Sequence, residues 1–442
     1  MLEILSRDYG IDRNLLTLSE TAITACQSEW ARIESTGMVN FLKVLKAFQE
    51  AHVGDDHFAG TTGYGYDDIG REGLERAWAK IFGAEKALVR WQVVSGTHAL
   101  SLCLFGLLRP GDRVVFATGA PYDTLHAVFG MDAASGSGGP ANLRPGCLAE
   151  LGITWKAVDM PPGGCPDIPR IVDAMDERTR LVFIQRSRGY AWRPSLSVRH
   201  IGKIASAVKA ARADAIVLVD NCYGEFVETL EPPQVGADVI AGSLIKNPGG
   251  GIAPTGGYIA GRAELVERIA TRLTAPGIGG ECGPTLGITR LLLQGLFLAP
   301  RLVREALKGA AFVARFFSDL GFEVMPRPGD ERSDLVQGIL LGNRERVVSF
   351  CRGLQLASPV NAHFAPEPAP MPGYENEIIM GGGTFIQGSS SELSADAPIR
   401  PPYAVFMQGG LCFEHVMIGA LLAANRLLAD GLLDTLPGRN TC

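Results

Sequence analysis

A lysine at position 246 ends a short apolar run, residues 239–245, and stands directly before a turn. Asn247, Pro248 and three glycines follow it. Because proline and glycine interrupt regular structure, Lys246 is predicted at the end of a strand. A lysine with apolar residues behind it is a candidate for imine chemistry, and Ser243 would place a hydroxyl near the same point. An isolated lysine is more often a solvated charge, so the interpretation depends on other parts of the chain.

A second candidate is the turn Ser95-Gly96-Thr97, which lies between a β-rich run, residues 87–94, and an apolar helix predicted over 99–108. The first turn of a helix has free backbone N–H groups and a favourable dipole, so it attracts a phosphate group. The hydroxyls of Ser95 and Thr97 would add donors. An ordinary serine or threonine helix cap has the same pattern, and the motif alone does not decide between the two.

Three further polar or aromatic residues follow predicted strands. Asp220 ends the continuous apolar run 215–219, Tyr122 follows the strand 114–117, and Arg188 follows the strand 180–185. A solvated arginine is nearly as good an explanation for Arg188 as an anionic ligand. In a parallel sheet ligands bind beyond the carboxyl ends of the strands. The sequence therefore predicts one shared site.

Strands alternate with helices through the first part of the chain, which indicates right-handed βαβ units and an α/β fold with a mostly parallel sheet. We expect an N-terminal helical arm at 1–60, a large domain at 61–300 and a smaller α+β domain at 301–442. Residues 357–408 are rich in proline, glycine and serine. They are predicted to form a long functional loop, which contains Arg400.

Composition excludes several classes of protein. The 442 residues carry a net charge of -6 and are 46% hydrophobic, with no dense Lys/Arg cluster, so nucleic acid is not an expected partner. No apolar run reaches the roughly 20 residues of a membrane helix, and the first residues do not resemble a signal peptide. Nine scattered cysteines favour a reducing cytoplasm, and seven histidines show no metal-binding spacing.

A lysine for a Schiff base, an acid, a phosphate site and an aromatic ring are the parts that pyridoxal 5'-phosphate requires. Their order along the chain matches the aspartate-aminotransferase-like fold, fold type I. Lys246 would hold the cofactor and act as the base, and Asp220 would keep the ring nitrogen protonated. Tyr223 would bind the ring 3'-oxygen, and Tyr122 would cover the ring. Ser95, Gly96, Thr97 and Ser243 would hold the phosphate.

The sequence resembles the cystathionine γ-synthase and methionine γ-lyase branch of that fold, and it is most similar to the aluminium-resistance subgroup. The segments that carry the resemblance span most of the chain: residues 61–71 (TTGYGYDDIGR), 94–99 (VSGTHA), 185–190 (QRSRGY), 219–221 (VDN), 243–250 (SLIKNPGG) and 400–403 (RPPY). The resemblance implies a homotetramer built as a dimer of dimers. It also implies that the loop from Tyr64 to Arg71 reaches the neighbouring subunit's phosphate and that Arg400 binds the substrate carboxylate.

Two departures from the better-known lyases are visible. Those enzymes have Tyr-x-Arg in the loop, whereas here Asp68 stands two positions after Tyr66, and Arg71 is the candidate for the charge. Their Ser-x-Thr-Lys is here Ser-Leu-Ile-Lys, which lacks one hydroxyl. Substrate and reaction outcome are therefore not transferred from the family.

The predicted function is elimination at a carbon–sulfur bond of a sulfur-containing amino acid, in the β or γ position. An aminotransferase or a threonine-aldolase-like enzyme remains the alternative, because both begin from the same imine. A regulator that holds the cofactor without turnover has no DNA-binding segment to support it. A dinucleotide fold is disfavoured because no strand leads into a GxGxxG followed by a helix.

Overall fold

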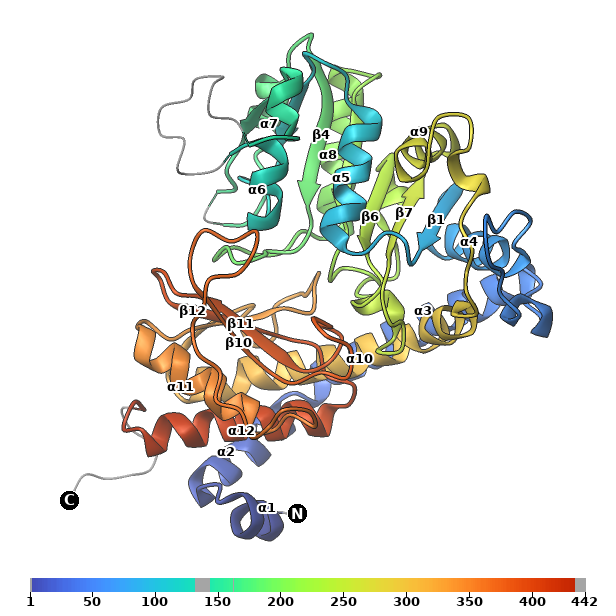
Figure 1. Ribbon diagram of the computed structural model, residues 1–442. Helices are drawn as coiled ribbons and strands as arrows, with labels where there is room; N and C mark the ends of the chain where they lie inside the picture. Colours follow the sequence, from blue (N-terminus) through green and yellow to red (C-terminus); the bar gives the residue numbers. More distant parts are fainter. Residues whose placement is uncertain (1, 132–143, 162, 434–442) are drawn as a thin grey trace.

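The computed structural model describes residues 2–131, 144–161 and 163–433, and these form two sheets with their covering helices (Figure 1). The first is a seven-stranded sheet with the order β1-β7-β6-β5-β4-β2-β3. Every neighbouring pair from β6 to β3 is parallel, and β7 is antiparallel to both β6 and β1. The strands are β1 (Lys86–Arg90), β2 (Arg113–Phe116), β3 (Thr154–Ala157), β4 (Thr179–Gln185), β5 (Ile216–Asp220), β6 (Val239–Ser243) and β7 (Gly257–Gly261).

Helices cover both faces of this sheet, which explains why β5 and β6 are buried along their whole length. On one face α5 (Gly96–Leu107), α6 (Asp123–Phe129) and α9 (Ala263–Leu273) share an apolar core with the strands. On the other face α4 (Ile69–Phe82), α7 (Ile168–Ala174) and α8 (Val198–Ala211) contribute to a second core. The predicted α/β architecture with a mostly parallel sheet is confirmed.

The smaller sheet is antiparallel, with the order β10-β11-β12-β9-β8. Its strands are β8 (Glu323–Met325), β9 (Gln337–Leu340), β10 (Ile378–Gly381), β11 (Ser394–Pro398) and β12 (Ala404–Gln408), and α11 (Arg344–Gln355) and α12 (Phe413–Ala429) pack against it. The expectation of one long loop at 357–408 was wrong, because three of these strands lie inside it. These three strands are short and lack the alternating apolar pattern by which a longer strand is recognised in a sequence. They are stabilised by pairing with residues that are distant in the sequence.

The first helices, α1 (Leu2–Tyr9), α2 (Arg13–Ala25) and α3 (Gln27–Glu50), form the predicted N-terminal helical segment. They pack against α12 and the long helix α10 (Thr289–Asp319), and the Trp30 indole donates to the Lys308 carbonyl at 3.1 Å. The expected domain boundary at 300 and 301 falls inside α10, so this helix connects the two sheets (Figure 1). The division into domains stays a prediction, and it includes residues 1, 132–143, 162 and 434–442, which lie outside the described residues.

Within the described part of the chain, no helix combines the length and the apolar character needed to cross a membrane.

Candidate functional site

Lys246 lies on a tight turn that follows β6 and opens the short helix η6 (Asn247–Gly249). The turn rests against α10: Gly250 has a φ of 59°, and a Cβ atom on it would lie 2.1 Å from the carbonyl oxygen of Gly295. Glycine is therefore required at this point of the turn. From the smaller sheet's side, the Ser391 hydroxyl donates to the Lys246 carbonyl at 2.6 Å. The backbone of Lys246 is thus fixed from two directions.

Asp220 is the last residue of β5, and it pairs in parallel register with Ala241 of β6. It is 8% exposed. Its Oδ1 accepts a hydrogen bond from the Cys222 backbone at 3.1 Å, and the Cys222 thiol also interacts with this carboxylate. Burial raises the pKa of Asp220, and the charge of Lys246 opposes this rise. The carboxylate lines the cavity, where it can accept a further donor.

The Tyr223 ring lies beneath the Lys246 ammonium, with Nζ 4.0 Å from the ring centroid. Tyr223 has a φ of 70°, a left-handed conformation that is uncommon for a residue other than glycine. Burial opposes the charged form of Lys246, but the acidic groups around it, led by Cys222, raise the pKa of its amine. The backbone at Tyr223 is held in a disfavoured conformation that places its ring at the lysine, as often occurs at functional sites.

The N-terminus of α5 faces the same space. Ser95 caps the helix by accepting a hydrogen bond from the His98 N–H at 3.0 Å. The helix thus begins at Gly96, earlier than the sequence indicated, because the cap residue precedes the apolar run. The backbone N–H groups of Gly96 and Thr97 donate to no acceptor among the described residues. Free N–H groups at a helix start, with the Ser243 hydroxyl nearby, suit an anion.

An aromatic wall closes one side of the site. The hydroxyls of Tyr122 and Tyr374 lie 2.9 Å apart, and the Tyr122 ring centroid is 5.3 Å from that of Tyr190. Burial raises the pKa of the Tyr122 phenol well above its ordinary value, so the ring is neutral at physiological pH. Tyr374 comes from the segment between α11 and β10, and nothing in its local sequence distinguished it.

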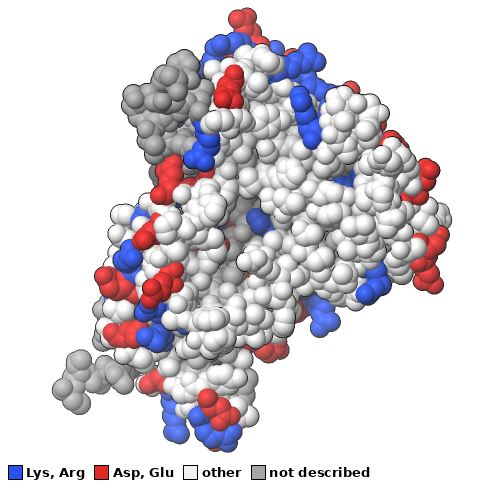
Figure 2. Space-filling view, in the orientation of Figure 1, with Lys and Arg blue, Asp and Glu red and all other residues white. Residues whose placement is uncertain are grey.

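These elements line one cavity of about 360 Å³ between the two sheets. Figure 2 shows that the molecule is hollowed between its upper and lower parts, and a basic side chain lies inside the hollow. Of the predicted residues, the cavity brings together Ser95, Gly96, Thr97, Tyr122, Asp220, Tyr223, Ser243 and Lys246. Sequence reasoning missed the smaller sheet's contribution, which includes Asp396 and Gln408. These two residues reach the cavity because β11 pairs with β12, and no local sequence pattern predicts that pairing.

Two predicted arginines do not line this cavity. Arg188 is fully buried, donates to the Met325 carbonyl at 2.6 Å and lies 3.7 Å from the Asp334 carboxylate. Arg400 pairs with Asp123 at 3.5 Å. Both arginines line a neighbouring cavity of about 370 Å³, with Tyr122 in the wall that the two cavities share. The structure thus gives Arg188 protein partners, and Arg400 stands behind the aromatic wall.

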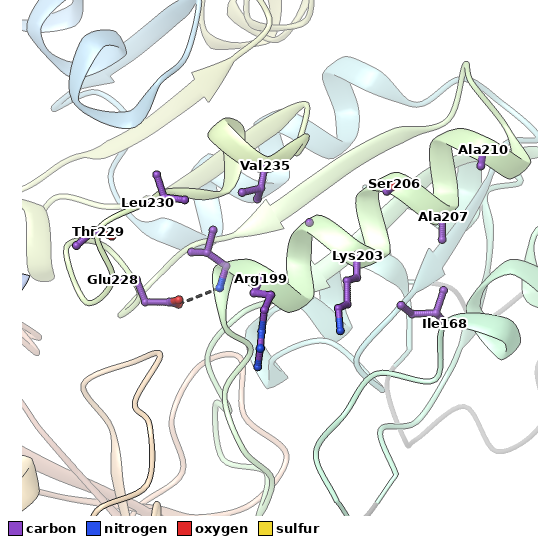
Figure 3. A pocket seen from close by; sticks show the side chains of 12 residues that line it. Ile168, Arg199, Lys203, Ser206, Ala207, Ala210, Glu228, Thr229, Leu230 and Val235 are labelled. Carbon is purple, nitrogen blue, oxygen red and sulfur yellow. Dashed lines mark hydrogen bonds between the residues drawn. The ribbon is translucent and has the colours of Figure 1, made fainter.

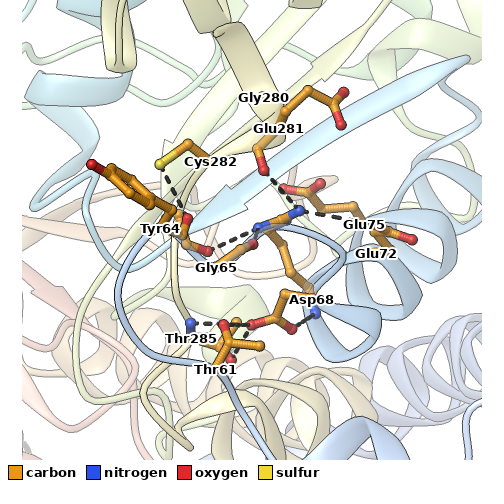
Figure 4. A network of polar contacts seen from close by, with 12 residues as sticks. Thr61, Tyr64, Gly65, Asp68, Glu72, Glu75, Gly280, Glu281, Cys282 and Thr285 are labelled. Atoms are coloured by element: carbon orange, nitrogen blue, oxygen red, sulfur yellow. Dashed lines mark hydrogen bonds and ion pairs between the residues drawn. The ribbon is translucent and has the colours of Figure 1, made fainter.

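No residue of the loop from Tyr64 to Arg71 lines the cavity of its own subunit. Figure 4 shows this loop in polar contact with the segment that contains Glu281 and Cys282. Arg71 is 2% exposed, and its guanidinium donates to backbone carbonyls, among them Gly283 at 3.0 Å and Glu281 at 3.3 Å. Arg71 therefore fixes the loop to the segment before α10, and its contact with a phosphate stays a prediction. The rings of Tyr64 and Tyr66 are 71% and 54% exposed.

A larger hollow of about 770 Å³ lies over α8, shares no lining residue with the Lys246 cavity and contains none of the predicted residues (Figure 3). Aliphatic side chains such as Ile168, Leu230 and Val235 form much of its lining, with Arg199 and Lys203 at its edge. It has no cluster of groups that would act together as acid, base or nucleophile. The larger of the two hollows is therefore not the one that contains the predicted site residues.

Comparison with known proteins shows what the chain is similar to. The sequence model for methionine gamma-lyase matches residues 15–428. The uncharacterised protein YnbB of Bacillus subtilis (strain 168) is 48% identical over 402 residues, which cover 91% of this chain and 94% of YnbB. A carbon-sulfur lyase involved in aluminium resistance from Clostridium novyi NT has a solved structure that superposes with a TM-score of 0.89. It is 47% identical and matches over 96% of this chain and 98% of its own.

The fold extends to more distant proteins. The pyridoxal-5'-phosphate-dependent protein YhfS from Escherichia coli matches with a TM-score of 0.58 and 16% identity, over 90% of this chain and 97% of its own. At this identity the likeness concerns the fold alone. The predicted fold type I architecture is confirmed.

Proposed function

Because the chain belongs to the methionine gamma-lyase family, we propose that it is a pyridoxal-phosphate-dependent lyase that breaks a carbon–sulfur bond in a sulfur-containing amino acid. The observation that carries the proposal is that Asp220, the last residue of β5, and Lys246, on the turn after the parallel strand β6, line one cavity. Pyridoxal phosphate requires an amine that binds its aldehyde and an acid that binds its ring nitrogen.

The described residues fit pyridoxal phosphate. The Asp220 carboxylate lines the cavity, where it could accept a hydrogen bond from a protonated ring nitrogen, and the N–H groups of Gly96 and Thr97 have no acceptor among the described residues, as a phosphate requires. Tyr122 provides a flat surface for the ring. Lys246 has the amine to which the aldehyde would bind. These donors and this acceptor are the reason to place the cofactor here.

When bound, the cofactor supplies a ring that accepts electrons from the substrate Cα. Asp220 would hold the ring nitrogen protonated by accepting its hydrogen bond. The Lys246 Nζ, once displaced by the substrate amine, would remove and return protons at the substrate carbons. Tyr122 and Tyr374 would exclude water from one side. The thiol would then leave with a proton, whichever of the β or γ positions carries the sulfur.

Arg400 is proposed to bind the substrate carboxylate. Its side chain is 34% exposed and pairs with Asp123 at 3.5 Å, a long contact that a carboxylate of the substrate could replace. Tyr122 separates Arg400 from the Lys246 cavity, so a small shift of this ring would join the two spaces.

A homotetramer, built as a dimer of dimers, is part of the proposal. The exposed rings of Tyr64 and Tyr66 lie 5.6 Å apart on a loop that Arg71 anchors, and in an assembly they would reach the neighbouring phosphate site. A cytoplasmic location is also proposed. All eight cysteines among the described residues are free thiols, including the exposed Cys165 and Cys412, which suits a reducing compartment.

The test is a product assay on the purified protein reconstituted with pyridoxal phosphate. Cysteine and homocysteine thioethers are supplied, and released thiol, ammonia and keto acid are measured, with Lys246→Ala as the control. We expect the three products in equal amounts from the wild type and none from the variant. A reaction that needs a second keto acid and releases no thiol would show that the proposal is wrong.

A further inference from the structure

An acid in the smaller sheet lies in the cavity without a role in holding the cofactor. Asp396 is the third residue of β11, opposite Phe406 of β12. Its Oδ2 accepts a hydrogen bond from the Gln408 amide at 3.0 Å and a longer one from the Tyr190 hydroxyl at 3.4 Å. Its Oδ1 accepts none from any described residue, although Asp396 lines the cavity.

Among the described residues, Lys246 is the only cation whose charge affects the pKa of Asp396. Burial raises the pKa of Asp396 to about 6, while its hydrogen bonds and the charge of Lys246 lower it. At neutral pH the group is therefore mostly ionised. Asp396 is half-buried, and its oxygen that faces the cavity without a hydrogen-bond donor would be stabilised by an approaching cation. Lys246 is committed to the cofactor in the proposed function, so another partner has to provide that charge.

The position of Asp396 shows which part of a ligand it would meet. The cofactor is accounted for by Lys246, Asp220 and the α5 turn, which belong to the larger domain's strand ends. Asp396 faces the same cavity from the opposite sheet, beside the apolar side chains of Met371 and Met380. A substrate whose amine is held at the cofactor would extend its side chain across this space. Its far end would then lie near the free carboxylate oxygen.

We propose that Asp396 binds a distal ammonium group of the substrate, so that the enzyme prefers thioether amino acids whose second arm on sulfur ends in an amine. The inference depends on the proposed function and names the substrate class of the same site. Met371 and Met380 would pack against the thioether, and Asp396 would bind the amine at its end. Methionine, whose second arm is a methyl group, would lack this contact.

A matched pair of substrates tests the inference. S-(2-aminoethyl)-cysteine and S-propyl-cysteine have arms of equal length, and they differ in the terminal ammonium or methyl group. The corresponding homocysteine thioethers cover elimination in the γ position. In the β case the Cβ–S bond breaks, the sulfur leaves as a thiol with a proton, and water completes the release of pyruvate and ammonia. The kcat/KM of each is measured with the wild type and with Asp396→Asn.

We expect the wild type to favour the aminoethyl substrate, and Asp396→Asn to lower its kcat/KM about ten- to hundredfold, the size expected for a hydrogen bond between charged groups. The propyl substrate should be cleaved equally well by both. Ser394→Ala is the control on the same strand and the same face; it removes a hydroxyl without changing charge, and it should leave the ratio of the two substrates unchanged.

A thermal unfolding measurement distinguishes binding from a structural role. If Asp396 served chiefly to hold Gln408 and Tyr190, Asp396→Asn would lower the melting temperature at pH about 8. Because one oxygen of this half-buried acid has no hydrogen-bond donor, we expect the melting temperature of the substrate-free holoenzyme to stay the same or rise. A lower melting temperature, together with equal losses on both substrates, would overturn the inference.

The role of Asp396 and the lyase activity can be contradicted independently of each other. A wild type that releases thiol from both substrates at equal efficiency, and that Asp396→Asn does not alter, overturns the role of Asp396 and leaves the lyase proposal intact. A holoenzyme that releases thiol from none of the four thioethers counts against the lyase itself.

Discussion

The Nζ atom of Lys246 lies 4.0 Å from the centroid of the Tyr223 ring. The backbone of Tyr223 has a φ of 70°, in the left-handed region. The turn after β5 therefore places an aromatic ring directly against the amine that follows β6. Since both strands are fixed by their parallel pairing, the relative position of the two side chains is a property of the sheet. The amine that is predicted to bind the cofactor thus lies against the Tyr223 ring and in the same cavity as Asp220.

Tyr223→Phe keeps the ring beneath Lys246 and removes the hydroxyl that is predicted to bind the cofactor's 3'-oxygen. We expect the affinity for pyridoxal phosphate to fall about ten- to hundredfold, since that oxygen is charged. The dissociation constant is measured by titrating the apoenzyme and following the yellow absorbance. An unchanged dissociation constant would show that the Tyr223 hydroxyl does not bind the cofactor.

Asp220→Asn preserves the shape of the side chain and removes its charge. The amide does not keep a ring nitrogen protonated, so the rate of elimination should fall by about a hundredfold or more, a size typical of losing one electrostatic contact to a transition state. Cofactor content, measured by absorbance, should remain. Asp220→Glu is the matched variant that keeps the charge, and it should retain more activity than the amide. Equal rates in all three proteins would contradict the assignment.

Gly96→Ala tests the phosphate site. A Cβ atom at Gly96 would lie 3.3 Å from the Cys222 sulfur and 3.4 Å from the Ser243 Cβ, so these side chains would have to yield by a few tenths of an ångström. Overpacking of about 1–3 kcal/mol would weaken cofactor binding about five- to hundredfold. Ser101→Ala, further along α5 and outside the cavity, serves as the control. If both variants bind pyridoxal phosphate like the wild type, the phosphate lies elsewhere.

Glu225 gives the stability a pH dependence. Its Oε1 accepts a hydrogen bond from the Tyr258 hydroxyl at 2.7 Å, and its Oε2 has no partner among the described residues. Burial raises the pKa of Glu225 from 4.5 to about 8. The folded chain thus favours the protonated acid, and this contribution to stability is complete below pH 4.5 and lost as the pH rises through about 8.

We therefore expect the free energy of unfolding to decrease between those pH values, and Glu225→Gln to remove that part of the decrease. Urea denaturation of both proteins at pH about 5 and about 9 measures it. The variant should be the more stable protein at the higher pH. Parallel curves for the two proteins would show that Glu225 is not the group responsible.

The sequence was informative where function depends on the ends of buried strands. The apolar runs before Asp220 and Lys246 are continuous because both faces of β5 and β6 are covered, and such runs can be recognised locally. The cap at Ser95 likewise follows from its residue type and from the helix after it. The order of these elements then placed their ends at one edge of the sheet.

The remaining parts depended on contacts that the sequence does not encode locally. Asp396 reaches the cavity through the pairing of β11 with β10 and β12, and β11 is too short and too poor in branched residues to be predicted. Arg188 follows a strand as Asp220 does, yet its guanidinium is used by the Met325 carbonyl. Both residues are polar and both lie at the end of a predicted strand, so the sequence does not distinguish them. They differ in their contacts: Asp220 lines the cavity, whereas Arg188 binds a backbone carbonyl.

The covalent attachment of the cofactor tests the central claim most directly. The holoenzyme is reduced with borohydride and digested, and the peptides are analysed by mass spectrometry. The account predicts that one peptide carries the mass of a reduced pyridoxyl phosphate and that fragmentation locates it on the side chain of Lys246. A label on another lysine, or an unlabelled Lys246 peptide from a reduced yellow protein, would contradict it.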